Sequence, residues 1–407
     1  MIPYGRQEIS RADIEAVLEV LHSDFLTQGP KVPCFEQIVA NYCGSKHAVA
    51  VNSATSALHI ACLALDLGPG DWLWTSPNTF VASANCALYC GAKVDFVDIH
   101  PSTYNLSVDA LEIKLQQAER QGRLPKILVP VHFAGQPCDM LAIHALSQKY
   151  GFKIIEDASH AIGSSYESES VSSALIRRKG ESGSQQSTEI KVGSCMHSDI
   201  TIFSFHPVKI ITTGEGGMAT TNDSKLDERL KCLRTHGIVN KRESMHPRPE
   251  NEIWNYQQVD LGYNYRMTDI QAALGVSQMS RLDRFIERRR EIAAEYDTAF
   301  ASLPVITPFQ HTKANSSFHL YPIRIRESIC KKTQQYFFEE LHARGIMANL
   351  HYIPVHRQPY YEAMGFRQGD FPEAEAYFRE ALTLPIYASL SESEQNLVVN
   401  AIKNLTE

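Results

Sequence analysis

A lysine with apolar neighbours is the residue of this sequence with the clearest chemical potential. Lys209 follows the segment TIFSFHPV, precedes two isoleucines, and is followed by a glycine cluster formed by Gly214, Gly216 and Gly217. Removing an ammonium group from water costs free energy, so a half-buried lysine lowers its pKa and becomes a neutral nucleophile. Such an amine is suited to Schiff-base chemistry. The alternative is an ordinary surface lysine at the end of a strand, which these neighbours disfavour.

A carboxylate upstream of the lysine supports the same interpretation. Asp157 ends the apolar segment KIIED at 153–157, so we expect its side chain at the ligand-binding edge of a sheet. There it could hold the protonated ring nitrogen of pyridoxal phosphate (PLP), whose ring acts as an electron sink. The alternative is a helix cap or a loop carboxylate. Because Asp157 and Lys209 follow different strands, two strand ends can converge on one cofactor.

Two further segments fit the phosphate and the ring of that cofactor. Residues 52–56 (NSATS) join a predicted strand to a predicted helix, where backbone N–H groups and the hydroxyls of Thr55 and Ser56 can bind a phosphate. Phe80 comes just after a strand and could stack on a flat ring. The alternatives are a simple helix cap for 52–56 and a core position for Phe80.

The elements that must position these residues alternate between strands and helices. This alternation predicts an α/β fold with a mostly parallel sheet and helices on both faces, and ligands beyond the carboxyl ends of its strands. The predicted strands are 48–51, 72–75, 93–97, 126–133, 153–156 and 201–205, and the predicted helices are 55–65, 81–89, one from 108, and one through 142–150.

The two ends of the chain have a different pattern. Ser10 can cap a helix with Asp13 at the capping-box position, and Ile14, Val17, Leu18 and Leu21 then repeat at helical spacing. Towards the C-terminus we expect a long charged helical stretch over 270–301, strands at 318–325 and 347–353, and helices at 333–344, 372–382 and 391–405. We therefore expect a large domain over 1–285 and a smaller α+β domain over 286–407.

One segment interrupts the alternation. Residues 167–189 are rich in serine, glycine, glutamine and charge, so we expect an exposed, mobile loop to which the sequence assigns no role.

Composition excludes several function classes. A net charge of −7 over 407 residues gives no nucleic-acid footprint. Nine cysteines without a C-x-x-C pair argue against a disulfide framework or a zinc site, so we expect no metal and a reducing compartment. Neither a signal peptide nor an apolar run of membrane-spanning length is evident, so we expect a cytoplasmic protein without a membrane partner.

Four motifs resemble one known family. NSATSAL at 52–58, EDASH at 156–160, SFHPVK at 204–209 with the GEGG that follows, and GYNYRMTD at 262–269 are similar to the DegT/DnrJ/EryC1/StrS sugar aminotransferases. This resemblance implies a PLP-dependent transaminase of fold type I. MIPYGRQ, SDFLTQGP, EDASH and SFHPVK are most similar to the branch that acts in pseudaminic acid biosynthesis.

That branch implies a specific reaction. Glutamate would donate its amino group to C4 of a UDP-linked 4-keto-6-deoxy-N-acetylhexosamine, giving UDP-4-amino-4,6-dideoxy-N-acetyl-β-L-altrosamine. The alternative is an aminotransferase of the same family that acts at C4 or C3 of another UDP- or dTDP-linked keto sugar.

The resemblance also implies residue roles. Lys209 would bind the cofactor covalently and move the proton, Asp157 would hold the ring nitrogen, and His160 would lie beside the ring hydroxyl. Asn264 would reach the phosphate of a neighbouring subunit, which implies a homodimer with shared sites. The other cofactor contacts would be Ala54, Thr55, Ser56, Phe80 and Ser204, and the nucleotide-sugar contacts Tyr4, Asp24, Phe25, Leu26, Thr27, His319 and Tyr321. His236 and His356 receive no role.

Three rival functions are disfavoured. A sugar 3-dehydratase of this fold would have histidine in place of Lys209. A regulator built on an aminotransferase-like domain usually carries an additional basic DNA-binding segment, which we do not expect here. A Rossmann oxidoreductase would need a G-x-G-x-x-G motif after a strand, and none is present.

Overall fold

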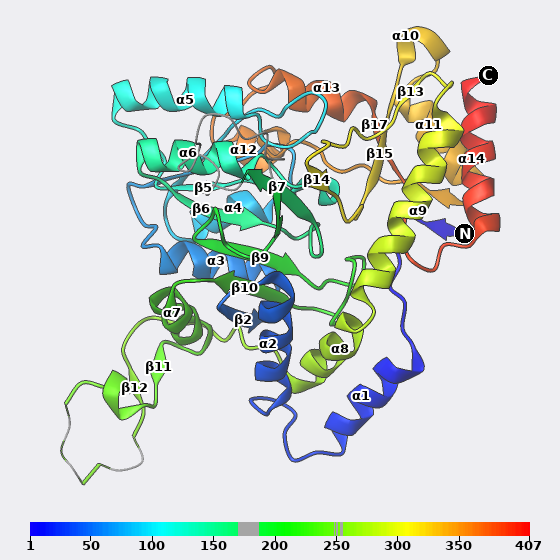
Figure 1. Ribbon diagram of the computed structural model, residues 1–407. Helices are drawn as coiled ribbons and strands as arrows, with labels where there is room; N and C mark the ends of the chain where they lie inside the picture. Colours follow the sequence, from blue (N-terminus) through cyan, green and yellow to red (C-terminus); the bar gives the residue numbers. More distant parts are fainter. Residues whose placement is uncertain (170–186, 248, 250, 253–254) are drawn as a thin grey trace, which may run out of the picture.

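A seven-stranded sheet forms the centre of the molecule in the computed structural model, which describes residues 1–169, 187–247, 249, 251–252 and 255–407 (Figure 1). One strand, β10, runs antiparallel to both of its neighbours, and the other pairs are parallel, which confirms the predicted sheet. In order across the sheet the strands are β2 (His47–Val51), β10 (Gly217–Thr221), β9 (Ile200–Ser204), β6 (Lys153–Asp157), β5 (Ile127–Val129), β3 (Trp72–Thr75) and β4 (Lys93–Phe96).

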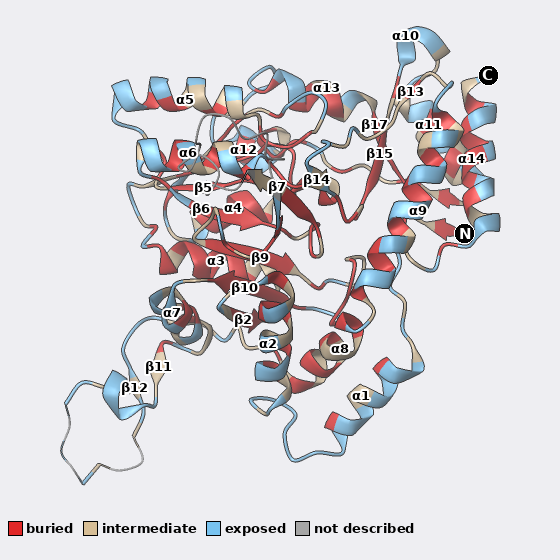
Figure 2. Ribbon diagram, in the orientation of Figure 1, coloured by how far each residue is buried: buried red, intermediate tan, exposed pale blue. Residues whose placement is uncertain are grey.

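Helices cover both faces of this sheet because its strands are apolar on both sides. Val49 and Val51 of β2 pack into one hydrophobic cluster, whereas Ala48 and Ala50 pack into another on the opposite face. Figure 2 shows the sheet as almost entirely buried. The first cluster contains residues of α3 (Ala54–Ala64), α4 (Ala82–Tyr89), α7 (Ser224–Arg234) and α13 (Pro372–Glu380), and the second contains residues of α2 (Lys31–Cys43), α5 (Val108–Gln121), α6 (Met140–Tyr150) and α8 (Asp269–Met279).

A third hydrophobic cluster belongs to the C-terminal part of the chain. It includes Ile2 from the chain start, because β1 (Ile2–Pro3) pairs in parallel with β16 (Ile346–Met347). The predicted domain boundary after residue 285 falls within α9, which runs on into this cluster. The other elements here are α9 (Leu282–Phe300), β13 (Val305–Ile306), β15 (Tyr321–Ile325), α10 (Glu327–Cys330), α11 (Gln334–Ala343), β17 (Ala381–Leu384) and α14 (Glu392–Thr406). By contrast, α12 (Pro359–Glu362) contributes Tyr361 to the first cluster.

Three predicted elements need correction. The long helix over 270–301 is two helices, α8 and α9, because the chain bends at Ser280 and Arg281. The strand predicted from 318 begins at Tyr321, since Phe318 adopts a left-handed backbone with φ 47°. The strand predicted at 347–353 is confined to β16.

The first helix, α1 (Arg11–Leu21), forms as predicted but turns an unexpected face to the protein. Ser10 and Asp13 make the expected capping box. However, Ile14, Leu18 and Leu21 are exposed, because the buried carboxylate of Asp13 anchors the opposite face to α8. This carboxylate accepts hydrogen bonds from Ser277 and Gln278 and an ion pair from Arg281.

The polar segment 167–189 is not a loop at its two ends. These ends form an antiparallel hairpin of β7 (Ser165–Glu169) and β8 (Ser187–Lys191), and β7 also pairs with β14 (Ala314–Asn315). Residues 170–186, the centre of the predicted loop, lie outside the described residues. A second small pair joins β11 (Ile238–Val239) to β12 (Gln257–Gln258). Among the helices of the described ranges, none combines the length and apolar character needed to cross a membrane.

Candidate active site

Lys209 and Asp157 lie together at the carboxyl edge of the sheet. Asp157 is the last residue of β6, and Lys209 stands in the turn that follows the neighbouring strand β9. Burial lowers the pKa of Lys209 to about 8, and the negative charge of Asp157 acts in the opposite direction. A useful fraction of this amine is therefore neutral near physiological pH, as the sequence predicts.

Asp157 is buried but has acceptor capacity to spare. Its side chain accepts hydrogen bonds from the Ser83 hydroxyl at 2.5 Å and from the Ser159 backbone N–H at 3.1 Å. Only 5% of the residue is exposed. A carboxylate has about four acceptor positions, so these two bonds leave room for a further donor. A protonated ring nitrogen is a donor of the required kind.

The start of α3 packs closely against β10 of the sheet. Gly217 of β10 pairs with Ser204 of β9, and a Cβ atom on Gly217 would lie only 2.5 Å from the backbone nitrogen of Ala54. No other side chain fits at position 217 without moving this helix end. The backbone N–H groups of Ala54 and Thr55 therefore open the helix beside the Ser204 side chain, an arrangement that fits a phosphate group.

Ser56 differs from its predicted use. Its hydroxyl lies 2.6 Å from Asn52 Oδ1, to which it donates, and 2.9 Å from the Ser53 hydroxyl. Its backbone N–H donates to the Ser53 side chain, which caps the helix. Because these groups already have partners within the cap, Ser56 stabilises the start of α3 and offers little to a ligand.

A cluster of buried imidazole and phenol rings surrounds the lysine. The ring centroids of His160 and His319 are 4.4 Å apart, and His160 and Tyr352 stack at 18° between ring planes. Burial, with the positive charge of Lys209, lowers the pKa of His160 and His319 well below the ordinary value and that of His351 to about 3. All three histidines are therefore neutral at physiological pH. Within the described ranges, the Nδ1 atom of His319 has no hydrogen-bond partner.

Two predicted contacts line the approach to this cluster. Phe80, at the start of α4, is 59% exposed, and its ring centroid lies 6.4 Å from that of Tyr352. The ring of Tyr4 lies 5.0 Å from His351, and the next residue, Gly5, packs against Val208. The structure thus brings the start of the chain to the neighbour of Lys209.

The loop over 24–27 packs against the end of the segment that carries GYNYRMTD, and Asn264 lies near the start of this segment. The backbone of Leu26 accepts a hydrogen bond from the Asp269 N–H, and Thr27 forms a bridge with Thr268. Asn264 is exposed, and its carbonyl accepts a bond from the Asn52 side chain at 3.5 Å. The side chains of Phe25 and Leu26 are also exposed, as is Asp24.

Tyr321 is not brought to the site. It is fully buried in the C-terminal cluster, and its hydroxyl donates to Asp297 at 2.6 Å. His356 is also buried elsewhere and pairs with Glu375 at 2.9 Å, which is a structural role. His236 is exposed on a left-handed turn with φ 57°.

Sequence reasoning missed Ser83, His351 and Tyr352. Ser83 is the second residue of α4, where the sequence pointed only to the nearby Phe80. The other two residues lie in a segment that was predicted to be a strand. The sequence offered one indication, the adjacent ring side chains of His351 and Tyr352 in HYIP. Only the structure shows which residues surround them.

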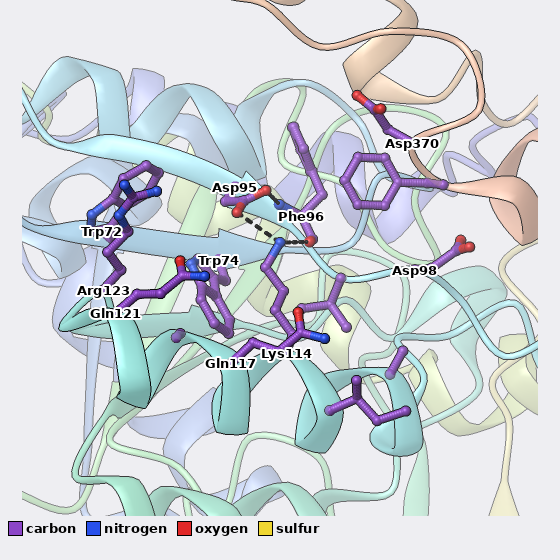
Figure 3. Close-up of a pocket in the computed structure, with 15 residues that line it drawn as sticks. Trp72, Trp74, Asp95, Phe96, Asp98, Lys114, Gln117, Gln121, Arg123 and Asp370 are labelled. Carbon is purple, nitrogen blue, oxygen red and sulfur yellow. Dashed lines mark hydrogen bonds and ion pairs between the residues drawn. The ribbon is translucent and has the colours of Figure 1, made fainter.

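A separate groove of about 450 Å³ lies at the edge of the sheet, between β3, β4, α5 and the segment before α13. Figure 3 shows Lys114 in this groove, bonded to the Asp95 carboxylate at 2.7 Å and to the Phe96 carbonyl at 2.6 Å. None of its lining residues is among the predicted site residues, so its shape gives no guide to the chemistry at Lys209.

Comparisons with known proteins agree with this geometry. Residues 7–403 match the model of the DegT/DnrJ/EryC1/StrS aminotransferase family. The chain is 37% identical to the spore coat polysaccharide biosynthesis protein SpsC of Bacillus subtilis, over 100% of this chain and 97% of that protein. It is 36% identical to the UDP-4-amino-4,6-dideoxy-N-acetyl-beta-L-altrosamine transaminase of Campylobacter jejuni, over 100% and 98%.

Solved structures show the same fold over the whole chain. Helicobacter pylori PseC, an aminotransferase of pseudaminic acid biosynthesis, superposes with a TM-score of 0.84 at 30% identity, covering 99% of this chain and 98% of that one. The sugar aminotransferase Spr1654 of Streptococcus pneumoniae, solved in its PLP form, gives a TM-score of 0.83 at 29% identity, with 100% and 98% covered.

Proposed function

Because this chain belongs to the DegT/DnrJ/EryC1/StrS aminotransferase family and is a PLP-dependent sugar aminotransferase, we propose that it aminates C4 of a UDP-linked 4-keto-6-deoxy-N-acetylhexosamine, with L-glutamate as the donor. The observation that carries the chemistry is the half-buried Lys209 beside a buried, partly satisfied Asp157. The observation that favours this sugar is the 36% identity to the Campylobacter jejuni transaminase. The product would be a 4-amino-4,6-dideoxy nucleotide sugar for pseudaminic acid biosynthesis.

The residues present fit the cofactor. Asp157 would accept the proton of the ring nitrogen, and Phe80 would cover one face of the ring. The N–H groups of Ala54 and Thr55, together with Ser204, would bind the phosphate. When bound, the cofactor supplies an electron sink for the bond that breaks at the amino-bearing carbon.

Lys209 would both attach the cofactor and move the proton. Its amine is partly neutral because burial lowers its pKa to about 8, so it can take a proton from the amino donor's carbon without first losing one. The neutral histidines around it add no positive charge to the site. His319, whose Nδ1 atom has no hydrogen-bond partner among the described residues, and Tyr4 remain our candidates for contacting the sugar nucleotide, together with the loop over 24–27.

A second copy of this chain would complete the site. The exposed Asn264 lies in the segment 262–269, and the loop with the exposed Phe25 and Leu26 packs against the end of this segment. Near this loop in sequence, α1 presents Ile14, Leu18 and Leu21 without cover from the described residues. Exposed apolar clusters of this kind mark interfaces. Sedimentation of the protein at micromolar concentration should show a dimer, and a stable, active monomer would contradict this arrangement.

We also propose a cytoplasmic location. All nine cysteines are unpaired, which suits a reducing compartment. Labelling the thiols in intact cells would test this, since oxidised cysteines in the native protein would oppose it.

The substrate assignment is tested by two half-reactions. Glutamate should convert the bound cofactor to its amine form, and the UDP-linked 4-keto-6-deoxy sugar should return it to the aldehyde, both followed by absorbance. A panel of UDP- and dTDP-linked 3-keto and 4-keto sugars, with pyruvate and oxaloacetate, provides the controls. A second candidate, another keto sugar of this panel, is favoured by the similarity to SpsC. Rapid turnover with the keto acids and none with a nucleotide sugar would overturn both assignments.

A further inference from the structure

Two neighbouring helices bring three cysteines to one place. The helices α3 and α4 pack against each other and run in the same direction, because each follows a strand of the same orientation and starts at the carboxyl edge of the sheet. Cys62 lies eight residues after the start of α3, and Cys90 eight residues after the start of α4. At a rise of about 1.5 Å per residue, both lie roughly 12 Å along their helices from the ends that meet the candidate active site. The two cysteines are therefore level with each other.

The three thiols of this cluster differ in their exposure. Cys62 and Cys86 are fully buried, whereas Cys90 is half-buried and can be reached from solvent, and all three are unpaired. Cys86 and Cys90 are four residues apart and share one face of α4. The thiol of Cys62 makes hydrogen bonds with both, and that of Cys86 also donates to the Ser83 carbonyl at 3.3 Å. Cys90 is thus the thiol that a small reagent meets first, with Cys62 behind it.

A buried imidazole lies beside the cluster. His59, one turn before Cys62 on α3, is 5% exposed, and its ring centroid lies 5.5 Å from that of Tyr89, the neighbour of Cys90. The Nδ1 atom of His59 lies 3.2 Å from the Tyr265 hydroxyl. Its Nε2 atom has no hydrogen-bond partner among the described residues. A buried nitrogen without a partner costs free energy, so this atom is available to a charged group at Cys90.

The surroundings of Cys90 favour its thiolate. The hydrogen bond with Cys62 lowers the pKa of Cys90 to about 6 against the effect of burial, and His59 adds to the lowering. The C-terminal end of α4 acts in the opposite direction. By contrast, burial raises the pKa of Cys62 well above the ordinary value. The titratable groups around Cys90 are His59, Cys62, Cys86, Tyr89 and Tyr263. An accessible thiolate next to a second thiol is typical of redox-sensing cysteines.

We propose that Cys90 and Cys62 are a peroxide-sensitive pair, in which Cys90 is oxidised first and Cys62 then closes a disulfide between α4 and α3. The Cys90 thiolate attacks one oxygen of hydrogen peroxide, so an S–O bond forms as the O–O bond breaks and hydroxide leaves. The Cys62 sulfur then displaces the hydroxyl group of this sulfenic acid, which leaves as water with the Cys62 proton as the S–S bond forms. The two sulfurs lose two electrons in all, and the peroxide is reduced to water.

This modification site is separate from the reaction at Lys209. In a reducing compartment a disulfide of this kind is transient, because thiol reductants restore both cysteines. The free thiols of the structure are therefore the resting state of the pair.

Peptide mapping after mild oxidation tests the proposal. The reduced protein with its cofactor is treated with equimolar hydrogen peroxide at pH 7, the remaining thiols are blocked with iodoacetamide, and the peptides are identified by mass spectrometry. We expect a linked Cys62–Cys90 pair that lacks two hydrogen atoms and that dithiothreitol reverses. The exposed Cys34 and the half-buried Cys330 serve as controls for exposure, and each should be oxidised about tenfold less.

Two variants make the test specific. Cys62→Ser should stop the reaction at the sulfenic acid of Cys90, which dimedone traps, whereas Cys86→Ser should leave the Cys62–Cys90 disulfide unchanged. Without peroxide, the rate of Cys90 alkylation should rise with a midpoint near pH 6, as its lowered pKa requires. Oxidation of Cys90 no greater than that of Cys34, or a link between Cys62 and Cys86, would overturn the proposal. Neither result bears on the chemistry proposed for Lys209.

Discussion

Two neighbouring carboxylates on β6 have almost the same burial and different surroundings. Glu156 is 2% exposed and Asp157 5%. Glu156 accepts hydrogen bonds from His132 at 2.7 Å, from Thr201 at 2.8 Å and from the Ser198 hydroxyl. Asp157 accepts one side-chain bond and one backbone bond. Because successive residues of a strand face opposite sides, the two groups enter separate environments.

The two carboxylates are almost equally buried, so burial does not distinguish a structural carboxylate from one available to a ligand. The number of hydrogen bonds that each one accepts does. Burial alone would raise the pKa of Glu156, but its hydrogen bonds with His132, Ser198 and Thr201 hold this pKa below the usual range. Glu156 therefore belongs to a hydrogen-bond network that connects β6 to His132, Ser198 and Thr201. Asp157 retains acceptor capacity next to Lys209, and such unfinished arrangements are typical of binding sites.

Among the tests of the Asp157–Lys209 site, Lys209→Ala should have the largest effect. The change removes both the attachment point of the cofactor and the proton carrier, so we expect a loss of transamination of about 10³-fold or more. Folding should be unimpaired, because a costly buried ammonium group disappears. Single-turnover kinetics measure the activity, and borohydride reduction with peptide mapping of the wild type should locate the cofactor on Lys209. A label on another lysine would refute the assignment.

Asp157→Asn should cost activity without costing the fold. The amide cannot stabilise the protonated ring nitrogen by charge, so we expect turnover to fall roughly 10²- to 10³-fold, while phosphate contacts preserve most of the cofactor affinity. The pKa of Lys209 should also fall below about 8, because the charge that raises it is gone. Turnover numbers, a cofactor titration and the pH dependence of lysine modification measure these effects. Near-normal turnover would remove Asp157 from the site.

Glu156→Gln should give the opposite pattern, with lost stability and retained chemistry. An amide replaces a carboxylate that accepts several bonds, so we expect the free energy of unfolding to fall by about 2–4 kcal/mol. Since the folded pKa of Glu156 is depressed, its contribution is present above the unfolded pKa of about 4.3 and is lost as pH falls further. Denaturant titrations at pH 7 and at pH 4 should show the difference shrinking. A stable variant with tenfold lower turnover would reverse the comparison.

Ser83→Ala is the variant for which we expect the smallest effect, and it tests how much one hydrogen bond to Asp157 contributes. It removes one neutral hydroxyl from Asp157, a bond worth about 1 kcal/mol, so we expect a three- to tenfold fall in kcat/KM. Steady-state kinetics beside a thermal melt measure this change. A loss above about a hundredfold would mean that Ser83 takes part in the reaction directly.

The sequence predicted the sheet that carries Asp157 and Lys209 better than it predicted the side chains that surround them. Apolar strands ending in Asp157 and leading to Lys209 define a parallel sheet whose carboxyl edge must hold both groups. The family resemblance assigned both His319 and Tyr321, two residues apart, to the nucleotide sugar. The left-handed Phe318 delays the strand to Tyr321 and separates the two side chains. His351 and Tyr352 depend on contacts with distant residues, which no local pattern encodes.

The face of α1 shows the same limit. Helical spacing correctly predicts the helix and its capping box, but not which face is buried. Asp13 decides the outcome, because an ion pair with Arg281 and hydrogen bonds from α8 turn the carboxylate inward. The apolar residues Ile14, Leu18 and Leu21 consequently face outward.

The pairing of β1 with β16 has a consequence for how the protein is made. Ile2 finds its partner Ile346 only after most of the chain has left the ribosome, which at cellular rates of synthesis takes roughly 20 to 70 s. Tyr4 then packs against His351, whose ring likewise emerges late. The nascent chain can therefore assemble the sheet with Lys209 and Asp157 long before Tyr4 and His351 come into contact. Until His351 is translated, the side of the site where Tyr4 and His351 meet stays open.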